Sequence, residues 1–379
     1  MKRNAIRFGL GSLIICFFFG CITDYSTPSR YQESNRLVVE GFITGDTTIE
    51  FILSRSVPLS ADSSFWPETG ATVNVRCDNG TVFGPAREST PGHYRLAMEA
   101  LIPSAAYCLE FSTGGETYRS EYLAPTSSPA IDSISWHKAA AGEPLEIFVS
   151  THDDERPDGY YLWTFQEDWE FTAQYDVHYF FDPVTHSYYE EKVNPFFFCW
   201  NKDTSKKILL ASTGELTENR IVNQSIHAIP CTDVRLSYLY CITVRQRTLT
   251  AESYQYYKEK RTLNEEMGGL FTPQPSELKG NISCVTNPEV PVIGYVDVAY
   301  TTEKRVFIDP TKIYEYIPYD CNERLKWDLP DTAMYKLDLR PIITPDSYPR
   351  PKMWANVKCV ECTATGTKNK PAFWPNDHQ

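Results

Sequence analysis

Residues 37–53 read LVVEGFITGDTTIEFIL, two runs rich in apolar and β-branched residues separated by the turn-forming pair Gly45-Asp46. Both runs have the length and composition of β-strands. The next run, Ala71 to Val75, alternates apolar and polar residues and leads into Asp78-Asn79-Gly80, which is typical of a hairpin. Further strand patterns follow at 93–98, 107–111 and 117–122. Because strands recur at short spacing without a helical period, we expect residues 37–124 to form an immunoglobulin-like β-sandwich.

A second β-rich domain is expected after the stretch APTSSP at residues 124–129. We take residues 125–140 as a linker and 141–379 as this domain. A long strand is predicted near its start, because six aromatic residues fall on odd positions and would share one face: Tyr161, Trp163, Phe165, Trp169, Phe171 and Tyr175.

One helix is predicted in the second domain, over residues 251–267. Thr250 is a suitable N-cap and Gly268-Gly269 supplies a stop. Residues 292–300 and 305–308 then read as a hairpin. The predicted fold class is therefore mainly β, with two domains and one helix lying on the second.

The first 20 residues are typical of a secretory signal peptide. Lys2, Arg3 and Arg7 precede a short apolar run that ends in Gly20-Cys21. A small residue directly before a cysteine is the pattern of a bacterial lipoprotein signal. We therefore expect cleavage after Gly20, lipidation of Cys21 and a polar tether over residues 21–36. The apolar run is too short to span a bilayer, since about 20 residues are needed.

The expected location is the outer membrane, with the protein held there by the lipid on Cys21. Ile22 rather than aspartate follows the cysteine, which favours passage to that membrane, while the leaflet stays open. Removal of the signal peptide takes the formal net charge from -13 to -16. So acidic a surface repels phosphate backbones, and we expect no nucleic-acid partner.

Aromatic residues make up 16 of the 41 residues from Tyr160 to Trp200, against 14% overall. Where they alternate they are expected to fill a core. Consecutive aromatic residues cannot all face one core, so any exposed recognition surface for sugar or protein should lie among them. These candidates are Tyr179, Phe180, Phe181, Tyr188, Tyr189, Phe196, Phe197 and Phe198.

Nine cysteines remain after Cys16 and Cys21 are set aside, and outside the inner membrane several can form disulfides. Cys77 and Cys108 lie on separate predicted strands of one domain and are one possible pair. Cys359 and Cys362 form a CxxC before a turn rather than a helix, without a second CxxC to complete a zinc site. We expect a structural disulfide or a crosslink to the body there, with Phe373-Trp374 helping to pin the tail.

No catalytic, metal or cofactor site is predicted. The chain lacks the sequence motifs of serine hydrolases, zinc proteases, P-loop enzymes and dinucleotide-binding enzymes. Residues 152–159 are acidic, but they lack the spacing of a calcium loop and are better explained as a turn before a strand. Residues 178–186 are likewise expected to form a polar hairpin rather than a zinc site.

Several stretches together carry a family resemblance: Leu37 to Gly41 with Ile43-Thr44, Gly268 to Phe271, Gly280 to Ile282, Arg305 to Ile308 and, most specific, Cys359-Val360-Glu361-Cys362 with Lys370-Pro371 and Phe373-Trp374-Pro375. Through them the mature chain resembles, over nearly its whole length, Bacteroidetes-type envelope lipoproteins known only as a domain of unknown function. The stretch 69–75 is also similar to prealbumin-like domains of outer-membrane receptors. The resemblance implies a non-enzymatic accessory of a TonB-dependent receptor in nutrient uptake. A stand-alone sugar- or peptide-binding lipoprotein and an unrecognised hydrolase are the alternatives.

Overall fold

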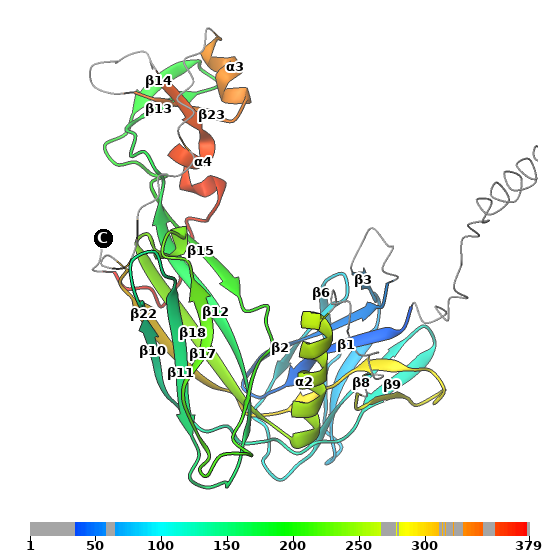
Figure 1. Ribbon diagram of the computed structural model, residues 1–379. Helices are drawn as coiled ribbons and strands as arrows, with labels where there is room; N and C mark the ends of the chain where they lie inside the picture. Colours follow the sequence, from blue (N-terminus) through cyan, green and yellow to red (C-terminus); the bar gives the residue numbers. More distant parts are fainter. Residues whose placement is uncertain are drawn as a thin grey trace, which may run out of the picture.

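The computed structural model describes residues 35–57, 65–266, 280–310, 329–343 and 353–376, together with residues 278, 313, 315 and 321. These residues are mainly β, as predicted. They form two β-sandwiches that share a buried contact, and a small projection at the far end of the second sandwich, here called the tip (Figure 1).

Nine strands of the first sandwich come from the N-terminal part of the chain. They are β1 (Leu37–Ile43), β2 (Thr47–Arg55), β3 (Trp66–Pro67), β4 (Thr72–Cys77), β5 (Val82–Phe83), β6 (Arg87–Thr90), β7 (His93–Met98), β8 (Tyr107–Thr113) and β9 (Glu116–Ser120). One sheet contains β1-β2-β7-β6, and the facing sheet contains β9-β8-β4-β5. The first two predicted strands pair antiparallel, with Val39 opposite Leu53.

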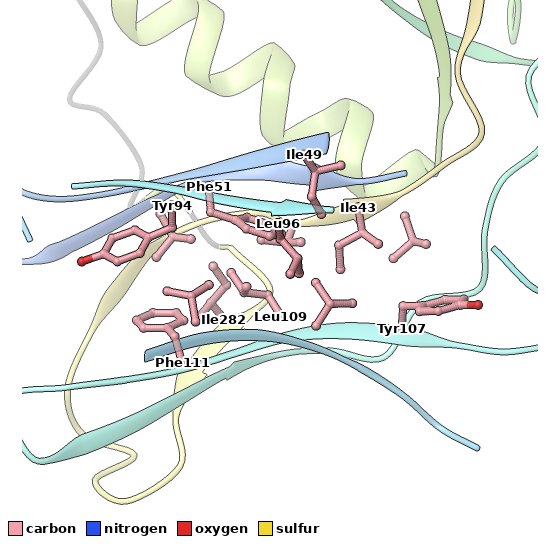
Figure 2. Close-up of a cluster of buried hydrophobic side chains, with 14 of the residues drawn as sticks. Ile43, Ile49, Phe51, Tyr94, Leu96, Tyr107, Leu109, Phe111 and Ile282 are labelled. Carbon is pink, nitrogen blue, oxygen red and sulfur yellow. The ribbon is translucent and has the colours of Figure 1, made fainter. Parts of the chain in front are cut away.

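The space between these two sheets is filled by side chains that alternate along the strands. Val73 and Val75 of β4 are fully buried. Figure 2 shows Phe51 from one sheet approaching Leu109 and Phe111 from the other. Each such buried side chain contributes about 1.5–3 kcal/mol relative to an exposed one. The period-two pattern in the sequence therefore holds the sandwich together.

The first sandwich is not contiguous in sequence, which corrects the predicted boundary at residue 124. Strands β20 (Val292–Gly294) and β21 (Asp297–Val298) pair in parallel with β1, and β19 (Ile282–Cys284) pairs with β9. The hairpin predicted over residues 292–308 is also wrong, because β22 (Thr302–Ile308) joins the second sandwich instead. Parallel partners are not joined by a tight turn, so local turn signals cannot reveal them.

The second sandwich packs a three-stranded sheet against a five-stranded one. The smaller sheet has the order β10 (Ile131–His137), β11 (Leu145–His152) and β17 (Arg220–Ile229). The larger has β12 (Tyr160–Thr172) at its centre, between β18 (Leu239–Leu249) on one side and β15 (Phe198–Thr204) and β16 (Leu209–Ser212) on the other, with β22 beyond β18. The prediction of one long strand with a buried aromatic face is confirmed for five of the six residues, Tyr161, Trp163, Phe165, Trp169 and Phe171, which all lie in this core. It is wrong for Tyr175, which lies beyond the end of β12 and packs against a separate cluster in the tip.

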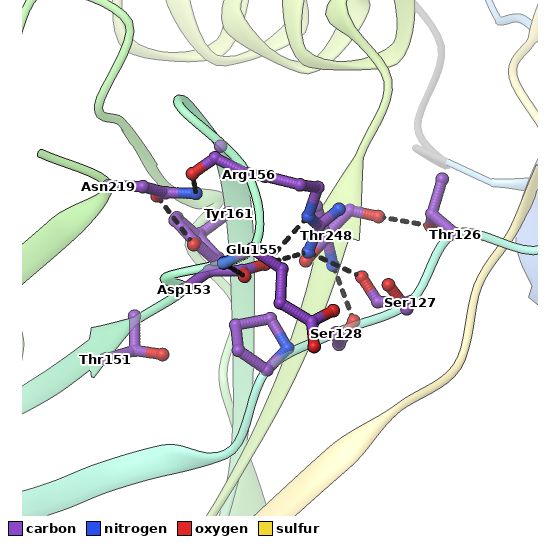
Figure 3. A network of polar contacts seen from close by, with 12 residues as sticks. Thr126, Ser127, Ser128, Thr151, Asp153, Glu155, Arg156, Tyr161, Asn219 and Thr248 are labelled. Atoms are coloured by element: carbon purple, nitrogen blue, oxygen red, sulfur yellow. Dashed lines mark hydrogen bonds and ion pairs between the residues drawn. The ribbon is translucent and has the colours of Figure 1, made fainter.

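The connection between the sandwiches is shorter than the predicted linker, because β10 already begins at Ile131. Polar contacts hold the connection against the second sandwich (Figure 3). Arg156 donates to the carbonyl of Ser127 at 2.9 Å and is itself paired with Asp153. The Thr126 hydroxyl donates to the carbonyl of Thr248 at 2.6 Å. The acidic stretch 152–159 thus orders the connection, as the turn interpretation requires.

The predicted helix is confirmed as α2 (Ala251–Glu266); Met267, its predicted last residue, lies outside the described residues. Thr250 caps it by accepting a hydrogen bond from the Ser253 N–H at 3.1 Å. Tyr256 and Tyr257 are buried in a cluster that also contains residues of both sandwiches. The helix therefore helps to join the two sandwiches rather than covering only the second (Figure 1).

The tip is a separate small unit within the predicted second domain. A two-stranded sheet of β13 (Tyr179–Asp182) and β14 (Ser187–Glu190) lies next to another of β23 (Leu339–Ile342) and β24 (Met353–Asn356). Two short helices complete it, α3 (Asp331–Lys336) and α4 (Val357–Val360). The 3-10 turns η1 (Val234–Leu236) and η2 (Cys362–Ala364) lie where the tip joins the second sandwich.

Candidate functional site

A pocket of about 350 Å³ opens on the tip, and the aromatic residues that the sequence proposed as a recognition surface form much of its wall. Five of the eight candidates contribute. The lining comprises Tyr179, Phe180, Phe181, Asp182, Pro183, Tyr189, Phe196, Tyr335, Arg340, Pro341, Val360 and Glu361. Its size lies at the lower end of the range typical of small-molecule sites.

The β13–β14 hairpin supplies one wall of the pocket. Phe180 is paired with Tyr189, and Phe181 with Tyr188. Phe180 and Phe181 are both only 6% exposed, so these two candidates add no exposed surface to the tip. The reason is that the hairpin is covered on both sides: Phe180 packs edge-on against Phe196, whereas Phe181 packs against Tyr335 and Trp354.

Exposed aromatic surface at the pocket comes mainly from Tyr189, whose exposed fraction is 44%. Tyr179 and Phe196 are half-buried. Tyr188 packs against Phe181 at 5.3 Å between ring centroids and does not line the pocket. The candidates Phe197 and Phe198 lie away from it, with Phe197 against the core of the second sandwich and Phe198 against Tyr238.

The polar groups of the pocket are held in fixed positions. Arg340 donates from Nε to Glu361 at 2.5 Å, and its guanidinium carbon lies 4.0 Å from the ring centroid of Tyr335. Hydrogen bonds from the Thr185 hydroxyl and the Val184 N–H hold the pKa of Asp182 below its usual range. Such a site can bind a small molecule by stacking its flat apolar face on the aromatic rings and by hydrogen-bonding its polar edge.

Sequence reasoning missed Tyr335, Arg340 and Glu361. They reach the pocket from α3, β23 and the turn after α4, and the first of them, Tyr335, lies 135 residues beyond the end of the aromatic segment at Trp200. Their surroundings in the sequence carry no aromatic bias. Only the CxxC that contains Glu361 distinguishes this part of the chain, and we interpreted that motif as structural.

That structural interpretation of Cys359 and Cys362 is confirmed, but the two cysteines have different partners. Cys359 is bonded to Cys321 within the tip, and Cys362 is bonded to Cys199 on β15. The suggested pair of Cys77 and Cys108 is wrong, because both are free and buried. On β4 and β8 they are one residue out of register, since Cys77 is opposite Tyr107. They therefore point to opposite faces of the sheet.

Other sequence candidates lie elsewhere or outside the described residues. Cys21 and the predicted signal peptide belong to the residues that are not described. Asp153 and Arg156 form an ion pair at 2.6 Å. In the described part of the chain, no group of three or more metal-ligating side chains is brought together. Within the same residues, no helix is long and apolar enough to cross a membrane.

Comparison with known families gives one match. Residues 22–305, about three quarters of the chain, match the family model "Domain of unknown function (DUF4249)". The match spans both sandwiches and ends within β22, so part of the tip, from α3 onwards, lies beyond it. No curated protein matches the chain.

Proposed function

The chain belongs to the DUF4249 family, and from this premise we propose that it is a non-enzymatic lipoprotein of the cell envelope. In this proposal the lipid on Cys21 holds the protein at the outer membrane. The two sandwiches carry the tip, and the tip assists a TonB-dependent receptor in nutrient uptake. The origin in Bacteroidetes and the receptor partner follow from the resemblance of the sequence to that type of lipoprotein.

The aromatic pocket on the tip carries this proposal. The tip projects from the end of the second sandwich that is farther from the first sandwich (Figure 1). The predicted tether precedes β1, so it would join the protein at the first sandwich. A tethered protein would therefore present the pocket away from its anchor. The ion pair between Arg340 and Glu361 and the disulfide between Cys321 and Cys359 fix the pocket walls, and preformed walls reduce the entropy lost on binding.

Exposed apolar side chains on the tip support contact with a protein partner. Val184 and Val193 are 85% and 77% exposed, and Leu337 is also largely exposed. Together with Tyr189 they leave exposed apolar surface on the tip, and apolar surface is typical of interaction sites.

The test is co-purification of the receptor with the tagged lipoprotein, with Tyr189→Ala and Tyr335→Ala in the tip. We expect both variants to recover less receptor, because each removes a ring from the pocket. Trp136→Ala is the matched control, since Trp136 is an exposed aromatic residue on β10 outside the tip. Full recovery of the receptor with the tip variants, or an equal loss of receptor with Trp136→Ala, would contradict the proposal that the tip contacts the receptor.

Anchoring is tested separately with Cys21→Ala. We expect this variant to lose labelled palmitate and to move to the soluble periplasmic fraction, because the acyl chains attach through that sulfur. Palmitate incorporation that persists in the variant would refute the lipidation site and point to Cys16.

A stand-alone ligand-binding lipoprotein is the second candidate, favoured by the size and the stacked rings of the pocket. It predicts that the purified protein binds a sugar or peptide without any receptor. Calorimetric titration of the purified protein and of Tyr189→Ala distinguishes the two functions, because only the second requires binding in the absence of the receptor.

A further inference from the structure

A second and larger concavity, of about 860 Å³, lies between the two sandwiches. Its first wall is the turn from β1 to β2 with the start of β2. Its second wall is formed by β12, β18 and the segment that enters β22. Clefts between domains are frequent positions for small-molecule sites. Three arginines line this one: Arg95, Arg245 and Arg247.

Two of these arginines have carboxylate partners. Arg95 is paired with Glu50 and Arg245 with Glu303, each at 2.9 Å. Arg247 differs from both. Its Nε donates to the Thr301 hydroxyl at 3.0 Å, and its guanidinium carbon lies 4.5 Å from the ring centroid of Phe42. Among the described residues, no carboxylate comes within ion-pair distance of Arg247.

The two terminal nitrogens of Arg247 carry four N–H donors, and these have no acceptor in the described part of the protein. Arg247 is half-buried, and this burial lowers the pKa of its guanidinium. Asp297 is the nearby acid that acts on it electrostatically, but its carboxylate accepts a hydrogen bond from Ser253. The terminal nitrogens of Arg247 are not among the buried polar atoms that lack a partner in the described residues, so they face the cleft, where the acceptor of a ligand can reach them.

Other contacts hold the guanidinium in place. The Phe42 ring that it covers is also stacked on Tyr257 of α2, with centroids 5.7 Å apart. Phe42 belongs to the first sandwich and Arg247 to the second, so the cation lies at the junction itself. The fork of terminal nitrogens is therefore oriented before any ligand arrives, as bidentate recognition requires.

The charges around the cleft limit the kind of anion. The three guanidinium groups are balanced by three carboxylates that line the same cleft, Asp46, Glu50 and Glu303. Such a balance disfavours multiply charged ligands such as phosphate and favours a single negative charge. We propose that the cleft between the sandwiches binds a small molecule through one carboxylate, held by the terminal nitrogens of Arg247, with Thr47 and Thr48 available to hydrogen-bond its polar body.

The test uses the full soluble chain and follows the side-chain Nε–H resonances of its arginines by NMR during titration. The probes are N-acetylglycine and galacturonate, which represent a peptide and a sugar carboxylate. Their neutral counterparts, N-acetylglycinamide and galactose, are the ligand controls, and inorganic phosphate tests for a different anion class. We expect the Arg247 resonance to shift in the millimolar range with at least one carboxylate and with neither neutral counterpart.

Variants separate binding from folding. Arg247→Gln should lower the association constant about tenfold or more, because charge-assisted bidentate hydrogen bonds are lost. Arg247→Lys keeps the charge without the fork and should restore only part of the affinity. Arg220→Gln is the matched control and should leave the association constant unchanged, because Arg220 is an exposed arginine on β17 of the second sandwich that does not line the cleft.

Three outcomes would overturn the proposal: no shift with either carboxylate, an equal shift with the neutral counterparts, or tighter binding of phosphate. The tip pocket is not involved, so loss of receptor association in tip variants would leave this test unaffected.

Discussion

Cys362 is bonded to Cys199 across a sequence separation of 163 residues, so the chain segment after the tip is covalently tied to the second sandwich. The other cysteine of the same CxxC, Cys359, is bonded to Cys321 inside the tip. One short motif therefore makes one cross-link within the tip and another between the tip and the second sandwich. Cross-links that close long loops restrict the unfolded chain most, which gives these bonds a structural role.

Replacing both Cys199 and Cys362 with serine should lower the free energy of unfolding by about 2–5 kcal/mol, since a cross-link over a long loop is lost. Urea unfolding followed by tryptophan fluorescence measures the change. The pair Cys321→Ser and Cys359→Ser is the comparison, and its effect should be confined to the tip, seen as faster amide exchange there. An unchanged urea midpoint in the first pair would contradict the assignment. Peptide mapping should recover both disulfides and no link between Cys77 and Cys108.

Trp374→Ala should destabilise the protein by about 3–5 kcal/mol, because it empties a buried site. The Trp374 ring packs against Phe307, and its Nε1–H donates to the buried Glu170 at 2.9 Å. Trp374→Phe keeps the ring contact but loses the donor, and should cost about 1–3 kcal/mol. Thermal unfolding checks both. Trp66→Ala, at an exposed position in the first sandwich, is the control that should change little.

Glu167 should make the second sandwich sensitive to acid. Burial alone would raise the pKa of Glu167, but hydrogen bonds from His227 and Tyr240 and the charge of Arg235 hold it below the usual range. A lowered pKa in the folded state stabilises the protein above the unfolded value of about 4.3, and this stability is lost as the pH falls through the folded value.

Glu167→Gln should therefore cost about 1–3 kcal/mol at neutral pH, because it weakens the charged hydrogen bonds of Arg235, which keeps its ion pair with Asp233. It should also flatten the fall in stability below about pH 4.3. Urea titrations across the acid range give both quantities. A variant that keeps the acid sensitivity of the parent would show that other carboxylates are responsible.

Asp297 should have the opposite effect on the pH dependence of stability, because its pKa is raised in the folded state. Burial raises its pKa to about 6, although Ser253 donates a hydrogen bond to its carboxylate. The folded state then binds a proton more tightly than the unfolded chain, so this group lowers stability as the pH rises from about 4 to about 6.

Asp297→Asn should remove that decline and raise stability at neutral pH by about 1–3 kcal/mol, provided the Ser253 hydroxyl still has an acceptor. The same urea titrations apply, with the exposed Asp46→Asn as the control. A loss of stability at neutral pH in Asp297→Asn would contradict the prediction. It would show that the surroundings of Asp297 stabilise its ionised carboxylate despite its burial.

Local patterns determined what the sequence could predict. β1 and β2 have apolar runs on either side of a turn, β12 has aromatic residues at a period of two, and α2 has a cap and a stop. Each depends on residues within about one element of one another, where side-chain period and turn chemistry act directly. The aromatic segment could likewise be found from the sequence, because its excess of rings is visible in the composition. Five of its eight candidate residues line the tip pocket.

Contacts between distant segments could be decided only by the tertiary structure. The parallel pairing of β1 with β20 forms because the chain comes back to the first sandwich after α2. No local turn motif in the sequence predicts this pairing. A register offset of a single residue separates Cys77 from Cys108 onto opposite faces, and the sequence does not state register. Coverage of the β13–β14 hairpin on two sides buries both Phe180 and Phe181. The environment of Arg247 arises only where two sandwiches meet, because burial and the supply of partners are properties of the assembled surfaces and not of neighbouring residues in the chain.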